Sequence, residues 1–399
     1  MPRPPMFQPT VRNPMAAQGH APALISVQSS LGGGSVATQA LLSAMLRSHR
    51  DVSDLIFSPG RLPQVEIHGQ LNTLDIDGLR ALTADDTRRI ASELIGDNKQ
   101  ALTMLREQGS CDISYALPGV ARFRVNIFIQ RGSCAIVMRV IPTQVPDFKS
   151  LSLPAHLAEI ANLRDGIVLV TGPRNSGKSS TLAALLNCIN EQQTHHVITI
   201  EDPIEFLHNH KRATIHQREL HSDAPNFAVA LRAALRQAPK VILLGEMRDR
   251  ETMEMALEAA EGGHLVLSTL NTIDAVNTMT RFVSTFAQAE QNSVRGRLAK
   301  VLRYVVSQRL IPRTDVEGRI AAVEILKVTP HILALLECDD PSGHNLLDAM
   351  KKGASEGMQH FDAEIEKLVT AGFVNDEVAT AYASDPQKLR EAMQQLAAK

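Results

Sequence analysis

The most constraining feature of this sequence is a series of short apolar runs in its second half, separated by segments with helical character. The five runs are Ile167–Thr171, Val197–Ile200, Val241–Leu244, His264–Leu270 and Arg319–Leu326. Strands that are apolar on both faces belong in a parallel sheet that helices cover on each side. The pattern therefore predicts a doubly wound α/β domain with these five runs as its strands.

The residues before this domain predict a smaller α+β domain. Helices are expected at 40–48, 83–95 and 101–107, and strands at 54–58, 64–68, 71–74, 111–117, 121–130 and 133–141. Three prolines, at 142, 146 and 154, then mark a linker. The expected organisation is a tail at 1–40, the small α+β domain at 41–145, a linker at 146–156, the α/β core at 157–329 and a C-terminal helical region at 330–399.

The first forty residues differ in composition from the rest. Six prolines lie between Pro2 and Pro22, three glycines follow at 32–34, and neither helical nor strand periodicity is present. We expect a disordered tail. Because no apolar core of a secretory signal follows its few arginines, the protein is expected to stay in the cytoplasm.

The overall composition excludes several classes of protein. With 41 Lys and Arg against 43 Asp and Glu, the net charge is −2, which argues against general binding to nucleic acid or anionic lipid. Hydrophobic residues make up 44% and charged residues 21%, as in soluble globular chains rather than in disordered or membrane-spanning ones. The four cysteines form no CxxC pair, so neither a zinc knuckle nor a disulfide framework is expected.

A glycine-rich loop directly after the first apolar run predicts a nucleotide phosphate site. The segment Gly172-Pro173-Arg174-Asn175-Ser176-Gly177-Lys178-Ser179 fits GxxxxGK[ST] and precedes an expected helix at 180–190, which is the context that this motif requires. Its glycines let backbone N–H groups converge on phosphate oxygens, Lys178 bridges the terminal phosphates, and Ser179 is suited to ligate Mg²⁺. We expect all eight residues and Ser180 to contact the nucleotide. Asn175 is expected to adopt unusual backbone angles, which Asn tolerates better than most residues.

Acidic residues follow two of the predicted strands and are candidates for activating water. Glu246 follows the run Val241–Leu244, and Glu201-Asp202-Pro203-Ile204-Glu205 follows Val197–Ile200. In doubly wound sheets, ligands bind beyond the carboxyl ends of the strands, where these side chains are expected. For Asp202 alone, a solvated turn or helix cap is an equal alternative.

Four motifs in order resemble those of a known family. They are TGPRNSGKSS (the Walker A loop), TIEDPIEF (the aspartate box), LRAALRQAPKVILLGEMRD (the Walker B region) and GGHLVLSTLNT (the histidine box). Together with ARFRVNIFIQRGSCAIVMRVIPT, GMQHFDAEI and ASDPQKLR, they resemble the secretion ATPases of the type II/type IV pilus superfamily. Within it, residues 40–395 are similar to the twitching-motility retraction motors of the PilT/PilU type.

The resemblance implies a fold and an assembly. It implies a PAS-like first domain, a RecA-like P-loop ATPase domain with C-terminal helices, and a homo-hexamer that binds ATP and Mg²⁺ between neighbours. It also implies partners, namely a platform protein of the inner membrane and a second retraction ATPase, and a position on the inner face of that membrane without insertion into it.

The resemblance also assigns roles to residues of the α/β domain. It makes Glu205 a catalytic carboxylate, Glu246 the Walker B carboxylate and His264 the first histidine of its box. At the place of the box's second histidine this chain has Asn271. Asn271 can donate a hydrogen bond to a γ-phosphate or to water, but it cannot carry a positive charge.

Two arginines in the first domain are candidates for contacting a nucleotide. If Arg131-Gly132 is a two-residue turn, Arg124 lies directly across from Arg139, and two cations on one sheet face repel unless an anion lies between them. A solvated basic strand face is the alternative. The resemblance implies that both are arginine fingers that reach a neighbouring subunit's ATP.

The sequence leaves several functions open. We expect a hexameric ATPase motor that powers pilus retraction. Asn271 and the segment GHNLLDAMKKGASEG favour a nucleotide-binding accessory subunit with weak turnover as an alternative, and a related secretion or conjugation ATPase is another. A DNA-translocating enzyme has little support, because Trp is absent and Tyr numbers three. Histidines near the aspartate box favour loop and interface roles over zinc binding.

Overall fold

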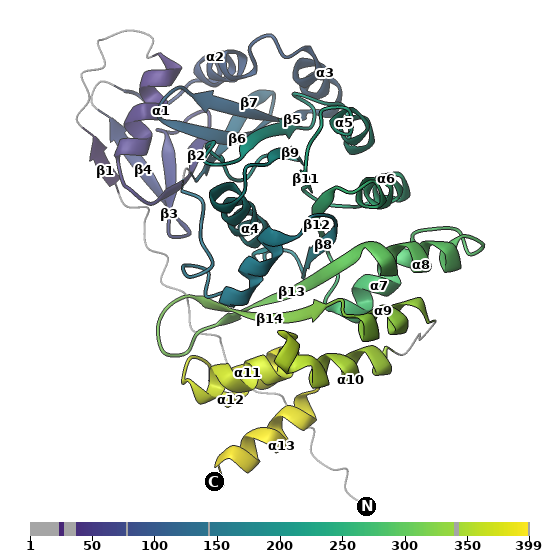
Figure 1. Ribbon diagram of the computed structural model, residues 1–399. Coiled ribbons are helices and arrows are strands. Elements are labelled where there is room, and N and C mark those ends of the chain that lie inside the picture. The colour runs from purple at the N-terminus through teal and green to yellow at the C-terminus, as the bar shows by residue number, and fades with distance from the viewer. Residues whose placement is uncertain (1–23, 28–36, 77–78, 143, 339–342, 398–399) are drawn as a thin grey trace, which may run out of the picture. The chain divides into compact units, whose positions relative to one another are not determined.

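The structure is a computed structural model that describes residues 24–27, 37–76, 79–142, 144–338 and 343–397. The chain divides into two compact units, Met1–Val140 and Ile141–Lys399 (Figure 1). Helices and strands occur in both units, and the described part of the chain contains two seven-stranded sheets. The α/β prediction is therefore confirmed.

The first unit has helices beside one sheet, as predicted. Its strands are β1 (Leu24–Val27), β2 (Val52–Phe57), β3 (Gln64–Ile67), β4 (Gln70–Ile76), β5 (Ser110–Leu117), β6 (Ala121–Gln130) and β7 (Ser133–Ile141), in the order β1-β4-β3-β2-β7-β6-β5. Its helices are α1 (Thr38–Arg47), α2 (Ala84–Ile95) and α3 (Lys99–Gln108). Buried side chains such as Leu42, Phe57, Ile90 and Phe123 join helices and sheet in one core.

Two local predictions in this unit are confirmed. Thr83 caps α2 through a capping box with Asp86, in which each residue's side chain accepts a hydrogen bond from the other's backbone N–H. Arg131 and Gly132 form the two-residue connection between β6 and β7, with φ angles of 48° and 75°. Such positive angles at both positions are typical of the tight turn that joins two strands of a hairpin.

The expectation that residues 1–40 form a structureless tail is wrong for part of that range. Leu24–Val27 is a strand that pairs in parallel with β4, in a register that matches Leu24 to Thr73. Helix α1 also begins inside the range, at Thr38. A four-residue strand that is set by a distant partner leaves no periodicity in its own sequence. Residues 1–23 and 28–36 lie outside the described residues.

The second unit contains the predicted parallel sheet. Its strands are β8 (Gly166–Thr171), β9 (His196–Glu201), β10 (Thr214–Glu219), β11 (Val241–Leu244), β12 (Leu265–Leu270), β13 (Leu302–Pro312) and β14 (Arg319–Lys327), in the order β10-β9-β11-β12-β8-β13-β14. All neighbouring pairs are parallel except β13 and β14. The expectation that Arg319–Leu326 is a parallel strand is wrong, because a short connection returns β14 antiparallel beside β13. Strands β10 and β13 were not anticipated.

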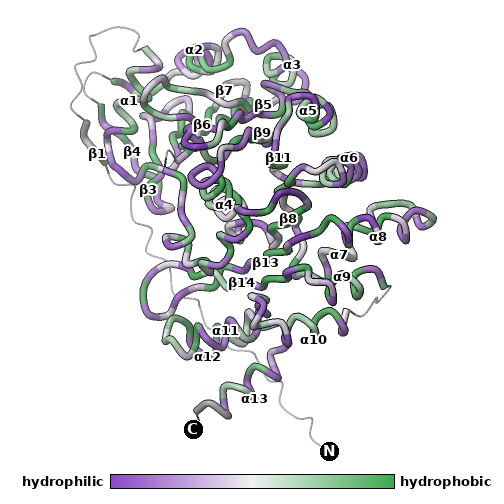
Figure 2. Tube along the Cα trace, in the orientation of Figure 1, coloured by the Kyte–Doolittle hydropathy of each residue, from purple (hydrophilic) through white to green (hydrophobic). Residues whose placement is uncertain are grey.

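Helices cover both faces of this sheet. The 3₁₀ helix η1 (Ala155–Asn162) and α4 (Lys178–Gln192) share one apolar cluster with Val168 and Val170 of β8. Ile167 and Leu169 of the same strand join the other cluster, with α5 (Phe227–Ala234), α6 (Arg250–Glu261), α7 (Ala275–Ser284) and α8 (Gln291–Val301). Apolar and polar residues are mixed along α6 and α8 in Figure 2, as expected for helices with one buried and one exposed face.

The C-terminal region is helical, as predicted. It contains α9 (Pro330–Glu337), α10 (His344–Lys352), the 3₁₀ helix η2 (Gly353–Glu356), α11 (Phe361–Thr370), α12 (Asp376–Tyr382) and α13 (Pro386–Ala397). Phe361, Ile365 and Leu368, which follow helical spacing, pack against Ile311 and Ile320 of β13 and β14. Across the described residues, no helix is long and apolar enough to cross a membrane.

Candidate nucleotide site

The glycine-rich loop lies between a strand and a helix, as its motif requires. It leaves β8 at Thr171 and enters α4 at Lys178. Asn175 has a φ of 62°, which confirms the expected unusual conformation. Gly177, at the start of α4, has a φ of 88°, and a Cβ atom there would lie 2.8 Å from Nε2 of Gln308 on β13. The backbone angle therefore favours glycine here, and any Cβ would also have to displace the end of the Gln308 side chain.

Lys178 is held over this loop by its carbonyl groups. Its Nζ donates hydrogen bonds to the carbonyl oxygens of Gly172, at 2.9 Å, and Pro173, at 2.8 Å. Burial lowers the pKa of the Lys178 ammonium group, and the nearby carboxylates of Glu246 and Glu205 oppose that change. The cation thus faces two acidic side chains across the space in front of the loop.

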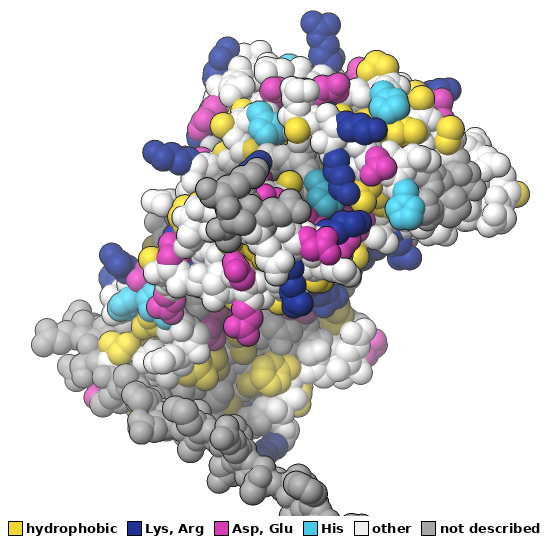
Figure 3. Space-filling model, turned by 90° about the horizontal axis from the view of Figure 1, so that it is seen from below, with side chains coloured by type: hydrophobic (Ala, Val, Ile, Leu, Met, Phe, Trp, Pro, Cys, Tyr) yellow, Lys and Arg dark blue, Asp and Glu magenta, His cyan; other side chains and the backbone are white. Residues whose placement is uncertain are grey.

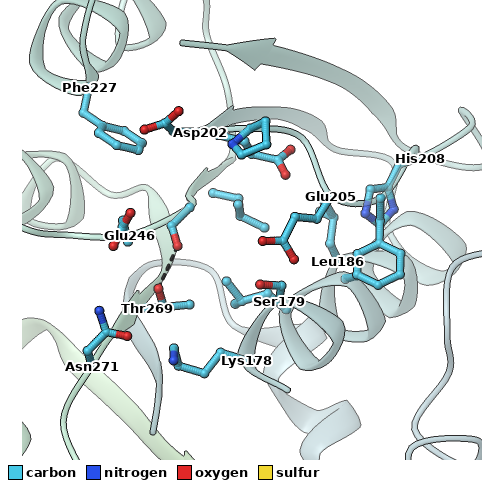
Figure 4. Close-up of a pocket in the computed structure, with 17 residues that line it drawn as sticks. Lys178, Ser179, Leu186, Asp202, Glu205, His208, Phe227, Glu246, Thr269 and Asn271 are labelled. Carbon is cyan, nitrogen blue, oxygen red and sulfur yellow. Dashed lines mark hydrogen bonds between the residues drawn. The ribbon is translucent and has the colours of Figure 1, made fainter. Parts of the chain in front are cut away.

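That space is a cavity of about 170 Å³ at the carboxyl ends of the parallel strands. Its polar lining comes from four places, namely the start of α4 and the residues at the ends of β9, β11 and β12 (Figure 4). The polar residues are Lys178, Ser179, Glu201, Asp202, Glu205, His208, Glu246, Thr269 and Asn271. The structure therefore brings Lys178, Ser179, Glu205 and Glu246 together, as expected from strand direction.

Glu246 is oriented by its neighbours after β11. Its Oε1 forms an ion pair with the guanidinium of Arg248. The hydroxyl of Thr269 donates to the carbonyl of Gly245 at 2.7 Å, which ties the end of β12 to this turn (Figure 4). Arg248 thus holds the carboxylate itself, and Thr269 holds the backbone of the turn that carries it.

Glu201, which belongs to the acidic segment at the end of β9, also lines the cavity, although the sequence assigned it no role of its own. It accepts hydrogen bonds from the hydroxyl of Thr199, at 2.6 Å, and from Nε2 of Gln217, at 3.0 Å. Burial raises the pKa of its carboxyl group, while these hydrogen bonds oppose that change. Thr199 lies two residues before Glu201, so the two side chains share one face of β9. This spacing is the feature of the sequence from which their hydrogen bond could have been predicted.

Asn271 and His264 lie at opposite ends of β12. Asn271 follows the carboxyl end and lines the cavity. His264 precedes the strand, and its Nδ1 contacts the carbonyl oxygen of Ala259 at 2.9 Å. A six-residue strand spans about 20 Å. The structure therefore does not bring His264 to the cavity of its own subunit, because the strand places it at the amino ends of the parallel strands.

A second hollow, of about 590 Å³, lies on the other flank of the glycine-rich loop. Loop residues 173–176 form one wall, and the connection between α12 and α13 forms another. Arg174, Arg309 and Arg319 line it together with Asp274. The loop thus separates a carboxylate-lined cavity from an arginine-lined one.

The two arginines of the first unit each face a carboxylate of that unit. Nε of Arg139 lies 3.0 Å from Oδ1 of Asp54, and Nε of Arg124 lies 3.9 Å from Oδ1 of Asp112. The side chain of Asp54 is 6% exposed, whereas those of Arg139 and Arg124 are 70% and 51% exposed. Both guanidinium groups therefore remain accessible to a further anion.

The histidines near the aspartate box form contacts among themselves. Nε2 of His196 lies 2.9 Å from Nδ1 of His216, and the rings of His210 and His216 meet edge to face. Burial lowers the pKa of His208 to about 4. Among the described residues, no group of three or more His, Cys, Asp or Glu side chains is placed to hold a metal ion.

Charge is mixed on the surface shown in Figure 3. Lys and Arg side chains lie between Asp and Glu side chains on this face, which is seen from below the view of Figure 1. This agrees with the net charge of −2. General nucleic-acid binding usually uses a continuous basic surface, whereas the face in Figure 3 carries charges of both signs.

Comparisons with known proteins agree with these features. Over 327 residues the chain is 40% identical to a twitching motility protein of Neisseria gonorrhoeae, covering 82% of this chain and 86% of that protein. Over 335 residues it is also 40% identical to the type IV pilus retraction ATPase PilT of Pseudomonas aeruginosa, covering 84% and 95%. A crystal structure of the pilus retraction motor PilT with bound ADP superposes with a TM-score of 0.79, at 38% identity, over 89% of this chain and 98% of that one.

A family model covers most of the chain and includes the whole nucleotide cavity. The model for the type II/IV secretion system protein family matches residues 107–397. The match takes in the glycine-rich loop, both acidic strand ends and the C-terminal helices. The chain belongs to the type II/IV secretion system protein family.

Proposed function

We propose that this protein is an ATP-hydrolysing motor that powers retraction of a type IV pilus. The observation that carries the proposal is the cavity in which Lys178 and Ser179 of a phosphate-binding loop face Glu205 and Glu246. The similarity to PilT extends over more than four fifths of the chain and so includes every element that builds this cavity. Mg-ATP is the proposed substrate, and ADP and phosphate are the products.

The residues of the cavity fit the chemistry of phosphoryl transfer to water. Backbone N–H groups of the loop and the ammonium of Lys178 would hold the phosphates, since a helix N-terminus attracts anions. The hydroxyl of Ser179 and the neighbouring carboxylates are hard oxygen donors, which suit Mg²⁺. When bound, the ion would neutralise charge on the phosphates. Glu246 and Glu205 would orient and deprotonate the attacking water.

The second hollow suits the rest of the nucleotide. With the phosphates bound at the loop, the rest of the nucleotide would extend past residues 173–176. The hollow on that side has a volume of about 590 Å³. Guanidinium planes such as those of Arg174 and Arg319, which line this hollow, can stack on aromatic rings. The ribose and base of ATP are therefore proposed to lie on this flank, away from the carboxylates.

The exposed arginines of the first unit support an assembled ring. Arg124 and Arg139 would be fingers that stabilise charge on the ATP of a neighbouring subunit. The proposed assembly is a homo-hexamer of PAS-like and RecA-like domains at 41–145 and 157–329, followed by the helical region at 330–399. It would act in the cytoplasm at the inner face of the cell membrane, with a platform protein and a second retraction ATPase as partners.

A second candidate function is an accessory subunit that binds nucleotide but turns it over slowly. The observation that favours it is the position of Asn271 in the cavity. An amide there can hydrogen bond to the γ-phosphate, but it supplies no positive charge to the transition state. The two functions therefore differ in turnover rather than in nucleotide binding.

Steady-state ATP turnover of the purified, assembled protein separates the two. The motor predicts robust turnover that Lys178→Ala abolishes, whereas Lys367→Ala, which changes an exposed lysine on α11, leaves it unchanged. The accessory subunit predicts negligible turnover that Asn271→His raises. Turnover that persists in Lys178→Ala would exclude this cavity as its source, and absence of pilus retraction in a strain deleted for this gene alone would support the motor.

A further inference from the structure

Glu324 is a buried carboxylate of the second unit that the proposed chemistry does not use. It lies on β14, and the whole residue is 2% exposed. Its Oε1 accepts a hydrogen bond from the backbone N–H of Ala275, at 2.9 Å. The backbone N–H of Phe361, at the start of α11, also acts on this carboxylate and lowers its pKa. The first turns of two helices, α7 and α11, therefore converge on one charged group.

The contact with α7 leads to the nucleotide cavity. Ala275 is the first residue of α7, and only three residues separate it from Asn271, which lines the cavity. The intervening turn is braced internally, because the hydroxyls of Thr272 and Thr278 lie 2.6 Å apart and Thr278 donates to the carbonyl of Asp274. A shift of Ala275 is thus transmitted to Asn271 through a short and well-bonded segment.

The contact with α11 leads to the C-terminal helices. Gln359 forms two backbone hydrogen bonds with Ile325, the neighbour of Glu324 on β14. Arg309 of β13 stacks on the ring of Phe361, with Cζ 3.9 Å from the ring centroid, and donates to the carbonyl of Tyr382 at 2.6 Å. Helices α11 and α12 are therefore fastened to the same two strands that hold Glu324.

We propose that Glu324 is a positioning residue for the ATPase site: by accepting a hydrogen bond from the first turn of α7 while it lies beside the start of α11, it sets the loop that carries Asn271 and couples it to the C-terminal helices. This inference rests on the proposed function. An ionised carboxylate at a helix N-terminus is favoured by the helix dipole, and here it serves two helices at once. The C-terminal region thereby becomes part of the support of the nucleotide cavity.

Because Glu324 is titratable, its proposed role should make the activity depend on pH. Burial raises the pKa of Glu324 to about 7, with Asp274 of the α7 turn raising it further and Arg309 of β13 lowering it. At the start of α11, His360 and Asp362 are the other titratable groups, and burial lowers the pKa of His360. Protonation removes the negative charge and turns one of the two acceptor oxygens into a hydroxyl donor, which weakens the attraction between Glu324 and the helix N–H groups. The loop is therefore fully supported only above about pH 7.

The activity and the stability that depend on Glu324 change in opposite directions with pH. Catalysis that needs the ionised form rises as the pH increases through about 7. Because the folded pKa lies above the unfolded value of 4.5, the folded state binds more protons between these values. The stability that Glu324 contributes is therefore present at low pH and falls as the pH rises through this window. A residue with only a structural role would make activity follow stability.

The test compares kcat for ATP across pH 5.5–8.5 in the assembled wild type and in Glu324→Gln. The amide of Gln carries no charge and has one acceptor oxygen in place of two, so kcat at high pH is expected to fall about tenfold, equivalent to about 1.4 kcal/mol. The fall of kcat on the acid side should disappear, and KM should change less than about twofold. Thr329→Ala removes the N-cap of α9 instead and should keep the wild-type profile. A wild-type profile in Glu324→Gln overturns the proposal.

A second variant keeps the proposal testable if Glu324→Gln does not fold. Asp274→Asn keeps an N-cap for α7 but removes a negative neighbour of Glu324, so the acid limb of kcat should move to lower pH. An unmoved limb overturns the proposal. If the wild type shows no turnover, the proposed function fails. Amide hydrogen exchange then tests Glu324 separately, and unchanged protection of Ala275 and Phe361 in Glu324→Gln would overturn its role.

Discussion

The two units of this protein hold their important cations in different ways. In the second unit Lys178 is partly buried, and two carbonyl groups of its own loop and two facing carboxylates surround it. In the first unit Arg124 and Arg139 each contact one carboxylate but keep at least half of the side chain exposed. The second unit thus provides a phosphate site from its own residues, whereas the first presents cations that can still accept an anion.

This difference separates binding from catalysis. A site built within one unit can bind nucleotide whether or not the protein is assembled. Exposed arginines add to catalysis only if a neighbour's nucleotide comes within reach, because their effect on transition-state charge is short-ranged. Variants in the two units should therefore affect different steps of the same reaction.

The largest effect that sharpens this comparison is expected from Arg124→Ala. If Arg124 acts as the proposed finger, kcat of the assembled protein should fall by about a thousandfold while ADP binding stays nearly intact. Turnover and fluorescent-ADP titration on the same preparation measure both. Arg88→Ala, which removes an exposed arginine of α2 in the same unit, is the matched control and should leave both unchanged. Unchanged turnover of Arg124→Ala in an assembled ring would contradict the role of a finger.

The site was predictable from sequence where its geometry is local. The residue types of the loop, glycines and Asn175, predict positive φ angles. The positions of Glu205 and Glu246 after apolar strands predict that both lie at the carboxyl ends of the sheet. The rest depends on which strands become neighbours. The direction of β14 and the role of Glu324 follow from the β13–β14 pairing, and no residue of β14 encodes it alone.

A smaller effect is expected from Gly177→Ala in the second unit. Alanine at a φ of 88° costs about 1 kcal/mol, and its Cβ would also displace Nε2 of Gln308. The hydroxyl of Thr181 donates to the same Gln308 side chain, so the first turn of α4 should shift. We expect ADP to bind about tenfold more weakly, a loss of about 1.4 kcal/mol, measured by calorimetric titration.

The matched control is Gly263→Ala, which has a φ of 87° but no atom within 4 Å of the new Cβ. It has the same backbone cost and should lower the melting temperature without weakening ADP binding. Equal losses of ADP affinity in the two variants would show that backbone strain alone, and not the contact with Gln308, explains the need for glycine in the loop.

The smallest effect is expected from Thr83→Ala in the first unit. Loss of this N-cap should destabilise α2 by about 1 kcal/mol and lower the melting temperature by a few degrees, with turnover and ADP binding unchanged.

Hydrogen bonds from the side chain and backbone of Thr83 lower the pKa of Asp86. A lowered carboxyl pKa stabilises the fold above the unfolded value of 3.8, and this stability is lost as the pH falls below it. The variant should therefore lose less stability than the wild type between pH 5 and pH 3. Thermal melts at both pH values check this. A fall in the ADP affinity of Thr83→Ala would contradict the expectation that nucleotide binding depends on the second unit alone.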